Sequence, residues 1–177
     1  MFCMISGGSG SGKSEYAEQM AVRLRKESQS ENFIYIATMM AQDEEAKKKI
    51  LRHQQMREKK GFQTVECYLH LKQLEVPKQA TVLLDCISNL TANEQFDPAG
   101  AGEQTVSEVL AGIANLRKQC THLVVVTNEI FSDGRAYDAQ TLAYIRYMGK
   151  INVQLASWAD DVAEVVYGIP LYRKKGG

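Results

Sequence analysis

Directly after the apolar run Phe2–Ser6, the sequence reads Gly7-Gly8-Ser9-Gly10-Ser11-Gly12-Lys13-Ser14, a full match to the pattern G-x-x-x-x-G-K-[ST]. Glycines reach backbone angles that turn successive N–H groups inward, and a helix beginning at Lys13 adds the positive end of its dipole. A strand before the pattern and a helix after it are the context that the motif requires. The stretch therefore predicts a phosphate-binding loop rather than a flexible glycine turn.

Two side chains of this loop have expected roles, and a third residue is expected to join them. Lys13 is expected to reach the β- and γ-phosphates of a nucleoside triphosphate, and the Ser14 hydroxyl to ligate Mg²⁺. A further metal ligand normally comes from the end of a neighbouring strand, and Asp85 follows such an apolar run. Glu129 competes for this role on the same grounds, and an ordinary strand-end carboxylate is the alternative for Asp85.

Outward from the loop, short apolar runs alternate with longer helical stretches. This pattern predicts strands at 2–6, 33–37, 64–67, 81–86, 122–127 and 162–167 and helices at 13–26, 43–59, 105–119 and 139–158. Residues 93–103 and 132–135 are expected to be loops, with a basic tail after Pro170. The run at 122–127 lacks polar alternation, as in a strand covered on both faces. We therefore expect one α/β domain over 1–177, a P-loop NTPase with a mainly parallel central sheet and helices on both faces.

Composition limits the possible functions further. The chain has 177 residues, 45% of them hydrophobic, and its 21 Lys and Arg balance its 21 Asp and Glu. Such a balance gives no overall field toward nucleic acid or an anionic membrane. No run has the length of a membrane span, and the N-terminus does not resemble a signal peptide, so we expect a cytoplasmic protein. The four cysteines include no C-x-x-C pair, which leaves a zinc site without support from the sequence.

A second candidate for chemistry lies in the charged helix expected at 43–59. His53 and Arg57 are four residues apart and would share a face. A neutral imidazole can attack phosphorus, while a neighbouring guanidinium can hold phosphate oxygens in a bidentate manner. From composition alone, a histidine that is merely solvated is the more common case. His70 and His122 show no partner pattern, and His122 is expected to be structural.

Taken together, these motifs resemble the bifunctional adenosylcobinamide kinase / adenosylcobinamide-phosphate guanylyltransferase family of cobalamin biosynthesis. The resemblance runs nearly end to end, and its most diagnostic part is Ile50-x-x-His53-x-x-x-Arg57 followed by Thr64-x-Glu66. A phosphate loop alone occurs in many enzymes, whereas its combination with this histidine segment is specific. The remaining matching segments are Tyr35-Ile36-Ala37-Thr38, Leu83-Leu84-Asp85-Cys86 with Asn89-Leu90, Val126-Thr127-Asn128-Glu129, and Gly149-Lys150-Ile151-Asn152.

The resemblance implies two reactions and a set of site residues. ATP or GTP would phosphorylate the aminopropanol hydroxyl of adenosylcobinamide, and GTP would then donate GMP to that phosphate through a guanylylated His53. Falling rates below about pH 6.5 are expected for such a histidine nucleophile. The resemblance also implies a RecA-like fold, a homotrimer, and nucleotide contacts at Thr38, Gln54, Arg57, Glu66 and Asp85.

Some positions depart from the family pattern. The stretch from Ile130 to Tyr137 has no proline, although the family usually has a glycine-rich stretch ending in Val-Pro there. Ile145-Arg146 stands where an Arg-Asp pair is usual. Ser9-Gly10 and Phe62 also differ from the common residues. These changes leave the nucleotide machinery intact but concern the acceptor substrate and the retention of both activities.

Two other functions remain open at this point. A P-loop kinase of another small alcohol would need no covalent histidine step. A nucleotide-binding switch would be expected to carry a guanine-reading loop such as N-K-x-D, which the sequence lacks.

Overall fold

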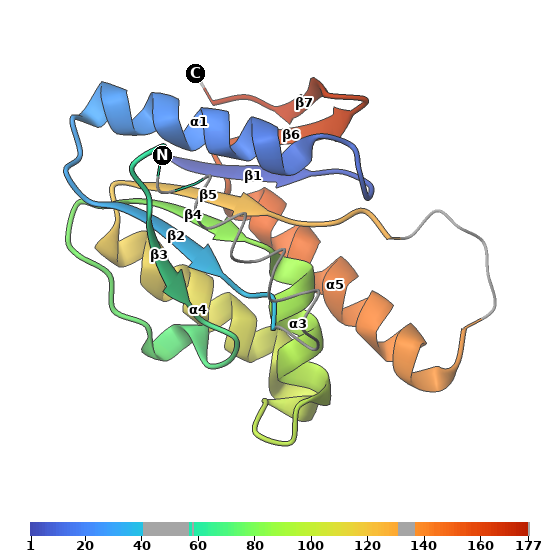
Figure 1. Cartoon of the computed structure of the whole chain (residues 1–177). Helices are drawn as coiled ribbons and strands as arrows, with labels where there is room; N and C mark the ends of the chain where they lie inside the picture. Colours follow the sequence, from blue (N-terminus) through green and yellow to red (C-terminus); the bar gives the residue numbers. More distant parts are fainter. Residues whose placement is uncertain (41–56, 58, 131–136, 177) are drawn as a thin grey trace.

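The computed structural model describes residues 1–40, 57, 59–130 and 137–176. In these ranges seven strands form one sheet in the order β3-β2-β4-β5-β1-β6-β7 (Figure 1). The strands are β1 (Phe2–Ser6), β2 (Phe33–Ala37), β3 (Gln63–Glu66), β4 (Thr81–Asp85), β5 (His122–Val126), β6 (Asp161–Val166) and β7 (Ile169–Lys174). All neighbouring pairs are parallel except β6 and β7. The mainly parallel sheet is confirmed.

Helices cover both faces of this sheet (Figure 1). One face packs against α1 (Lys13–Ser28), and the other against α3 (Ile87–Phe96), α4 (Thr105–Gln119) and α5 (Ala139–Trp158). The short 3₁₀ helices η1 (Leu71–Gln73) and η2 (Gly102–Gln104) lie in the connections.

Successive residues of each strand alternate between the two hydrophobic cores. In β4, Leu83 packs on the α1 side, whereas Val82 and Leu84 pack on the other. Both faces are buried, which explains why the strands are apolar without polar alternation. Cys3 and Cys86 are buried in the α1-side core as small apolar residues.

The register brings the functional ends of the strands to one side. Ile5 pairs with Val126, and Val126 pairs with Asp85, which in turn pairs with Ala37. The carboxyl ends of β1, β5, β4 and β2 therefore lie along one margin of the sheet, where open α/β sheets bind ligands. We call this margin, with the loop 7–12 that follows β1, the nucleotide edge.

Two sequence-based expectations about local structure are wrong. The sequence pattern predicts no helix before 105 in this region and a loop from Asn93, but α3 spans Ile87–Phe96, because Leu90 and Thr91 are buried and the helix is held by tertiary packing. The tail after Pro170 forms the antiparallel strand β7 at the sheet margin. Proline is tolerated at such a margin because it need not donate to a further strand.

The expected helix at 43–59 lies mostly outside the described residues, and so does the expected turn at 132–135. Within the described ranges, no helix combines the length and apolar character needed to cross a membrane.

Candidate nucleotide-binding site

The predicted phosphate loop connects β1 to α1 as the motif requires. Gly10 and Gly12 have φ angles of 70° and 87°, in the left-handed region that favours glycine. A Cβ atom built on Gly8 or Gly10 would meet no described atom within 4 Å, so the loop faces open space there. Helix α1 begins at Lys13, which places its N-terminal partial charge at the end of the loop.

The loop is held from both sides by backbone hydrogen bonds. Glu129, after β5, donates its N–H to the Gly7 carbonyl at 3.2 Å, and Gly168, in the β6–β7 turn, donates to the Ser11 carbonyl at 2.8 Å. A Cβ atom on Gly12 would stand 3.2 Å from the Gly168 Cα atom. The β6–β7 turn thus packs closely on the phosphate loop and supports its shape.

The two predicted loop side chains lie at the beginning of α1. Lys13 Nζ donates to the Gly8 carbonyl at 3.0 Å, so its ammonium group spans the loop. Ser14 is exposed on the first turn of the helix. An ammonium group across a cradle of glycine amides is the arrangement that binds the phosphates of a triphosphate.

Asp85 ends β4 and receives a hydrogen bond from a residue with no role predicted from sequence. Tyr35 of β2 donates its hydroxyl to Asp85 Oδ2 at 2.8 Å. The Arg57 guanidinium stacks 3.7 Å from the centre of the Tyr35 ring, and the Phe62 ring meets the same ring edge-on. Tyr35 therefore joins the predicted metal ligand to the last residue of the histidine segment.

Asp85, Tyr35, Arg57 and Lys13 interact electrostatically. Burial raises the pKa of the Asp85 carboxyl above its ordinary value, whereas the Tyr35 hydrogen bond and the charges of Arg57 and Lys13 lower it. Burial, followed by the charge of Asp85, also raises the pKa of Tyr35, so its hydroxyl keeps the proton that it donates. Lys13 and Arg57, which come from separate motifs, thus both act on one carboxyl group.

The residues after Arg57 are anchored on the α1 side of the sheet. Lys60 forms an ion pair with Glu18 of α1. Phe62 stacks on Phe33 with ring centres 3.7 Å apart. Arg57 itself is 5% exposed. These contacts hold Arg57 against Tyr35 on the α1 side of the sheet.

The side chain of Thr38 is engaged in hydrogen bonds within the protein. Its side chain is fully buried, and its hydroxyl donates to the Cys86 carbonyl and accepts from the Cys86 N–H, both at 2.8 Å. In this arrangement Thr38 fixes the backbone next to Asp85. Its predicted contact with nucleotide stays a prediction.

The other predicted residues are placed as follows. Glu66 is exposed at the end of β3 and accepts a hydrogen bond from Tyr68 at 2.7 Å. Glu129 lies beside the phosphate loop through its backbone. His53 and Gln54 lie outside the described residues.

The oxygen donors at this edge fit a Mg²⁺ ion. The Ser14 hydroxyl is exposed, and the Asp85 carboxyl lies close enough to Lys13 for the lysine charge to lower its pKa. Hydroxyl and carboxylate oxygens, completed by phosphate and water, are the ligands that Mg²⁺ takes.

Sequence reasoning does not identify two residues that support this site. Tyr35 lies in the segment Tyr35–Thr38 that resembles the family. The sequence indicates a special role for it only by placing a tyrosine in an otherwise apolar strand. Its partner is hidden in the sequence because only the strand order sets β2 beside β4. Gly168 follows the last strand that the sequence predicts. Its contact with Gly12 depends on the β6–β7 turn, which the sequence does not predict.

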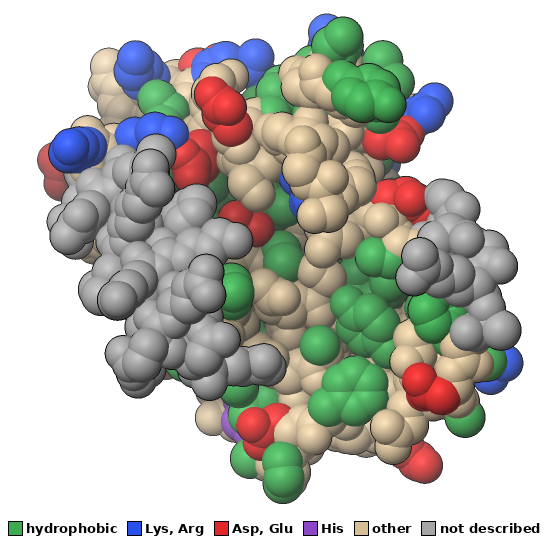
Figure 2. Space-filling view, turned by 45° about the vertical axis from the view of Figure 1, so that its right-hand side comes forward, with side chains coloured by type: hydrophobic (Ala, Val, Ile, Leu, Met, Phe, Trp, Pro, Cys, Tyr) green, Lys and Arg blue, Asp and Glu red, His purple; other side chains and the backbone are tan. Residues whose placement is uncertain are grey.

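The surface beside this edge carries few charges. Figure 2 shows mostly hydrophobic and uncharged atoms between the two segments drawn in grey. Phe96, at the end of α3, is 51% exposed, and its ring centre lies 6.3 Å from that of Tyr144 in α5. An exposed apolar area of this kind commonly receives a ligand or partner.

Comparison with known sequences agrees with these features. The sequence model of the family described as cobinamide kinase / cobinamide phosphate guanyltransferase matches residues 3–172. The bifunctional adenosylcobalamin biosynthesis protein CobU of Escherichia coli (strain K12) is 32% identical over 184 residues, which cover 96% of this chain and 97% of that protein. The protein of the same name from Salmonella typhimurium (strain LT2) is 29% identical with the same coverage.

Comparison with solved structures supports the fold. A KaiC-like protein, PH0186, from Pyrococcus horikoshii OT3 has a TM-score of 0.52 at 13% identity, covering 98% of this chain and 78% of that one. The flagellar accessory protein FlaH from Methanocaldococcus jannaschii has a TM-score of 0.51 at 10% identity, covering 99% of this chain and 78% of that one. With the phosphate loop in place, the predicted P-loop NTPase fold is confirmed.

Proposed function

Since the chain belongs to the cobinamide kinase / cobinamide phosphate guanyltransferase family, we propose that it phosphorylates adenosylcobinamide and then transfers GMP from GTP to that phosphate. The word bifunctional in the relatives' names favours both steps over a kinase of another small alcohol. A switch without catalysis is likewise disfavoured. ATP and GTP are the proposed phosphoryl donors, and GTP is the proposed guanylyl donor.

In the kinase step, the alcohol oxygen of the aminopropanol arm attacks the γ-phosphorus and the hydroxyl proton passes to solvent. The bond from the γ-phosphorus to the bridging oxygen breaks, and the nucleoside diphosphate leaves. Lys13 and the amides of residues 7–12 hold the negative oxygens of the triphosphate. Ser14 and Asp85 would hold Mg²⁺, which when bound supplies positive charge between the phosphates. Arg57 adds a fixed positive charge beside Asp85.

In the guanylyl step, we propose that the imidazole of His53 attacks the α-phosphorus of GTP and that pyrophosphate leaves. A phosphate oxygen of adenosylcobinamide phosphate then attacks the same phosphorus, and the bond from phosphorus to the histidine nitrogen breaks. Thr38, Gln54 and Glu66 are proposed nucleotide contacts. Arg57 carries the structural support for this step, because it lies at the nucleotide edge and is four residues from His53.

One observation carries the proposal. Tyr35 donates its hydroxyl to Asp85 Oδ2 at 2.8 Å, and the Arg57 guanidinium stacks 3.7 Å from the centre of the same ring. The end of the histidine segment thus lies beside the proposed Mg²⁺ ligand.

The guanylyl step is tested with GTP labelled at the α-phosphate. Wild-type protein is expected to retain acid-labile label after denaturation, because a phosphoramidate is stable until the nitrogen is protonated. His53→Ala should lose the label, and the matched control His122→Ala should retain it. Label that persists in His53→Ala would refute the assignment of the nucleophile.

The kinase step is measured separately with label at the γ-phosphate and cobinamide as acceptor. His53→Ala should keep this activity, since no histidine takes part in the kinase step. An absence of label transfer in both assays with wild-type protein would overturn the proposed function as a whole.

An exposed aromatic ring on α3 supports a proposal for where the acceptor substrate binds. We propose that the large corrinoid docks against the exposed ring of Phe96, which contacts the ring of Tyr144. Phe96→Ser should raise the KM for cobinamide and leave the KM for nucleotide unchanged.

We further propose that the chain acts as a single domain over 1–177, that it is a cytoplasmic protein, and that it forms a homotrimer. One sheet extends from Phe2 to Lys174, and all four cysteines are free, as in reducing compartments. The outer strand β7 exposes Ile169 at 62% and Leu171 at 42%, which suits an interface between copies. Light scattering on the purified protein should give three times the monomer mass, and any other mass would contradict the trimer.

A further inference from the structure

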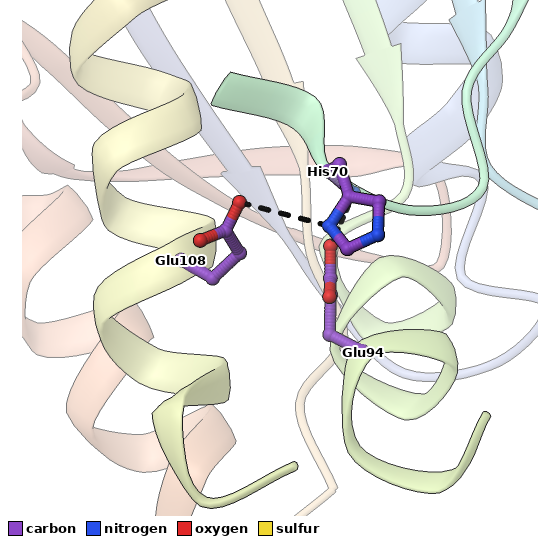
Figure 3. A group of neighbouring side chains, drawn as sticks. All are labelled: His70, Glu94 and Glu108. Atoms are coloured by element: carbon purple, nitrogen blue, oxygen red, sulfur yellow. Dashed lines mark hydrogen bonds and ion pairs between the residues drawn. The ribbon is translucent and has the colours of Figure 1, made fainter. Parts of the chain in front are cut away.

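On the side of the sheet that α3 and α4 cover, three metal-ligating side chains meet. His70 precedes η1, Glu94 lies on α3 and Glu108 lies on α4 (Figure 3). One ligand atom from each lies within 4.8 Å of the others. We call these three residues the helix-side cluster. The sequence shows no partner pattern for His70 because both partners come from distant helices.

Glu94 is fixed in the cluster by the backbone. Its side chain is fully buried, and its two oxygens accept hydrogen bonds from the His70 N–H at 2.5 Å and from the Ala101 N–H at 3.0 Å. A carboxylate has about four lone-pair sites, so each oxygen keeps capacity for one further partner. Glu94 is therefore a positioned ligand that does not need to reorganise.

Only one carboxylate oxygen of Glu108 accepts a hydrogen bond from the described residues. Its Oε2 atom accepts from Lys72 Nζ at 2.7 Å. Its Oε1 atom is buried and has no hydrogen-bond partner among the described residues, and the nearest ring nitrogen, His70 Nδ1, is 3.9 Å away. An unsatisfied buried oxygen is destabilising unless a cation or a water meets it. Figure 3 shows this oxygen directed toward the imidazole.

From these observations we propose that His70, Glu94 and Glu108 bind one Zn²⁺ ion. One imidazole nitrogen and two carboxylate oxygens are common zinc ligands, and water would complete the tetrahedron. Imidazole favours Zn²⁺ over Mg²⁺, which prefers oxygen ligands alone. The site would thus be chemically distinct from the Mg²⁺ site at Ser14 and Asp85.

The geometry requires a small closure around the ion. Ligand atoms of a tetrahedral zinc site stand about 3.3 Å apart, given bonds of about 2.0–2.1 Å. The His70 side chain is 41% exposed, so it can move toward the carboxylates and leaves a path for the ion. Lys72 balances part of the charge of Glu108 from the opposite oxygen.

A bound ion would add a further link between the residue before η1, α3 and α4. The cluster is also connected to the nucleotide edge, because Asn93, beside Glu94, donates to the carbonyls of Thr38 and Tyr68 at 2.9 and 3.0 Å. We expect the ion to act on stability, and no catalytic role is assigned to it.

Isothermal titration of the metal-free full chain with Zn²⁺ tests the proposal. Wild-type protein should bind one ion. Both His70→Asn, which suits the left-handed backbone at this position, and Glu108→Gln should weaken binding by more than about tenfold. Lys72→Met should bind Zn²⁺ more tightly, because it removes a competing cation from Glu108.

Two controls separate this site from other zinc ligands. His122→Ala and Cys67→Ser should bind Zn²⁺ as wild type does, since neither residue belongs to the helix-side cluster. No saturable binding by wild-type protein would overturn the proposal. Binding that survives in His70→Asn, or that is lost in Cys67→Ser, would overturn it equally.

Discussion

Asp85 at the nucleotide edge and Glu94 in the helix-side cluster are both carboxyl groups withdrawn from solvent, yet the protein surrounds them differently. Asp85 is met by side chains, namely the Tyr35 hydroxyl and the charges of Arg57 and Lys13. Glu94 is met by backbone, namely the N–H groups of His70 and Ala101.

The difference teaches how each region is used. Side-chain partners can move or change charge when a nucleotide binds, so they leave Asp85 available for the proposed metal ion. The backbone partners of Glu94 connect α3 to the segments that contain His70 and Ala101. Glu94 therefore has a mainly structural role. Substitutions at the nucleotide edge should therefore affect activity, whereas those at Glu94 should affect stability.

The largest effect is expected from Lys13→Ala. Loss of the ammonium group across the phosphate loop should reduce kinase kcat/KM by about 10²–10³-fold, the range seen when one stabilising group of a transition state is removed. Initial rates with γ-labelled nucleotide measure this. Lys72→Ala is the matched control, because Lys72 pairs with Glu108 in the other region. Equal losses in both variants would break the comparison.

The second prediction concerns the pH dependence of the Mg²⁺ requirement. Because burial raises the pKa of Asp85, this carboxyl takes up a proton at a higher pH than an ordinary aspartate, and its protonated form is a poor Mg²⁺ ligand. The Mg²⁺ concentration for half-maximal kinase rate should therefore increase as the pH falls. Measurements in the His53→Ala background exclude the guanylyl step. A requirement that stays constant across the acid range would contradict this role of Asp85.

Glu94→Gln should destabilise the protein while sparing the chemistry. The glutamine amide offers one acceptor oxygen where two backbone N–H groups need partners, so we expect a loss of about 1–3 kcal/mol in the free energy of unfolding. Urea denaturation gives this value, and kinase rates well below the melting temperature should stay near wild type. Glu103→Gln, an exposed change in η2, should alter stability by less than about 0.5 kcal/mol.

The smallest effect is expected from Tyr35→Phe. The ring that stacks on Arg57 remains, but the hydrogen bond that lowers the pKa of Asp85 is lost. The pH at which the Mg²⁺ requirement increases should therefore move upward, and the loss in kcat/KM should correspond to about 0.5–1.5 kcal/mol. Tyr144→Phe, which removes a hydroxyl bonded to the Ser88 carbonyl, is the control and should leave the pH profile unchanged.

Local patterns predicted much of the architecture. The helices at 105–119 and 139–158 have the expected bounds, because each carries its apolar residues at helical spacing and ends where that spacing stops. The helix at 87–96, which the local pattern did not predict, has a physical reason. Helix α3 has a weak local pattern, and its turns around Leu90 are stabilised by burial against other elements.

The amino-acid sequence alone was enough to predict the phosphate loop, the expected roles of Lys13 and Ser14, and the family to which the chain belongs. These depend on residues close together in sequence, whose spacing is enough to define a strand, a loop and a helix. Only the tertiary structure brought Tyr35 beside Asp85, and His70 beside Glu94 and Glu108. Strand order and helix packing decide such neighbours, and both arise from burial of the whole sheet, which no short segment encodes.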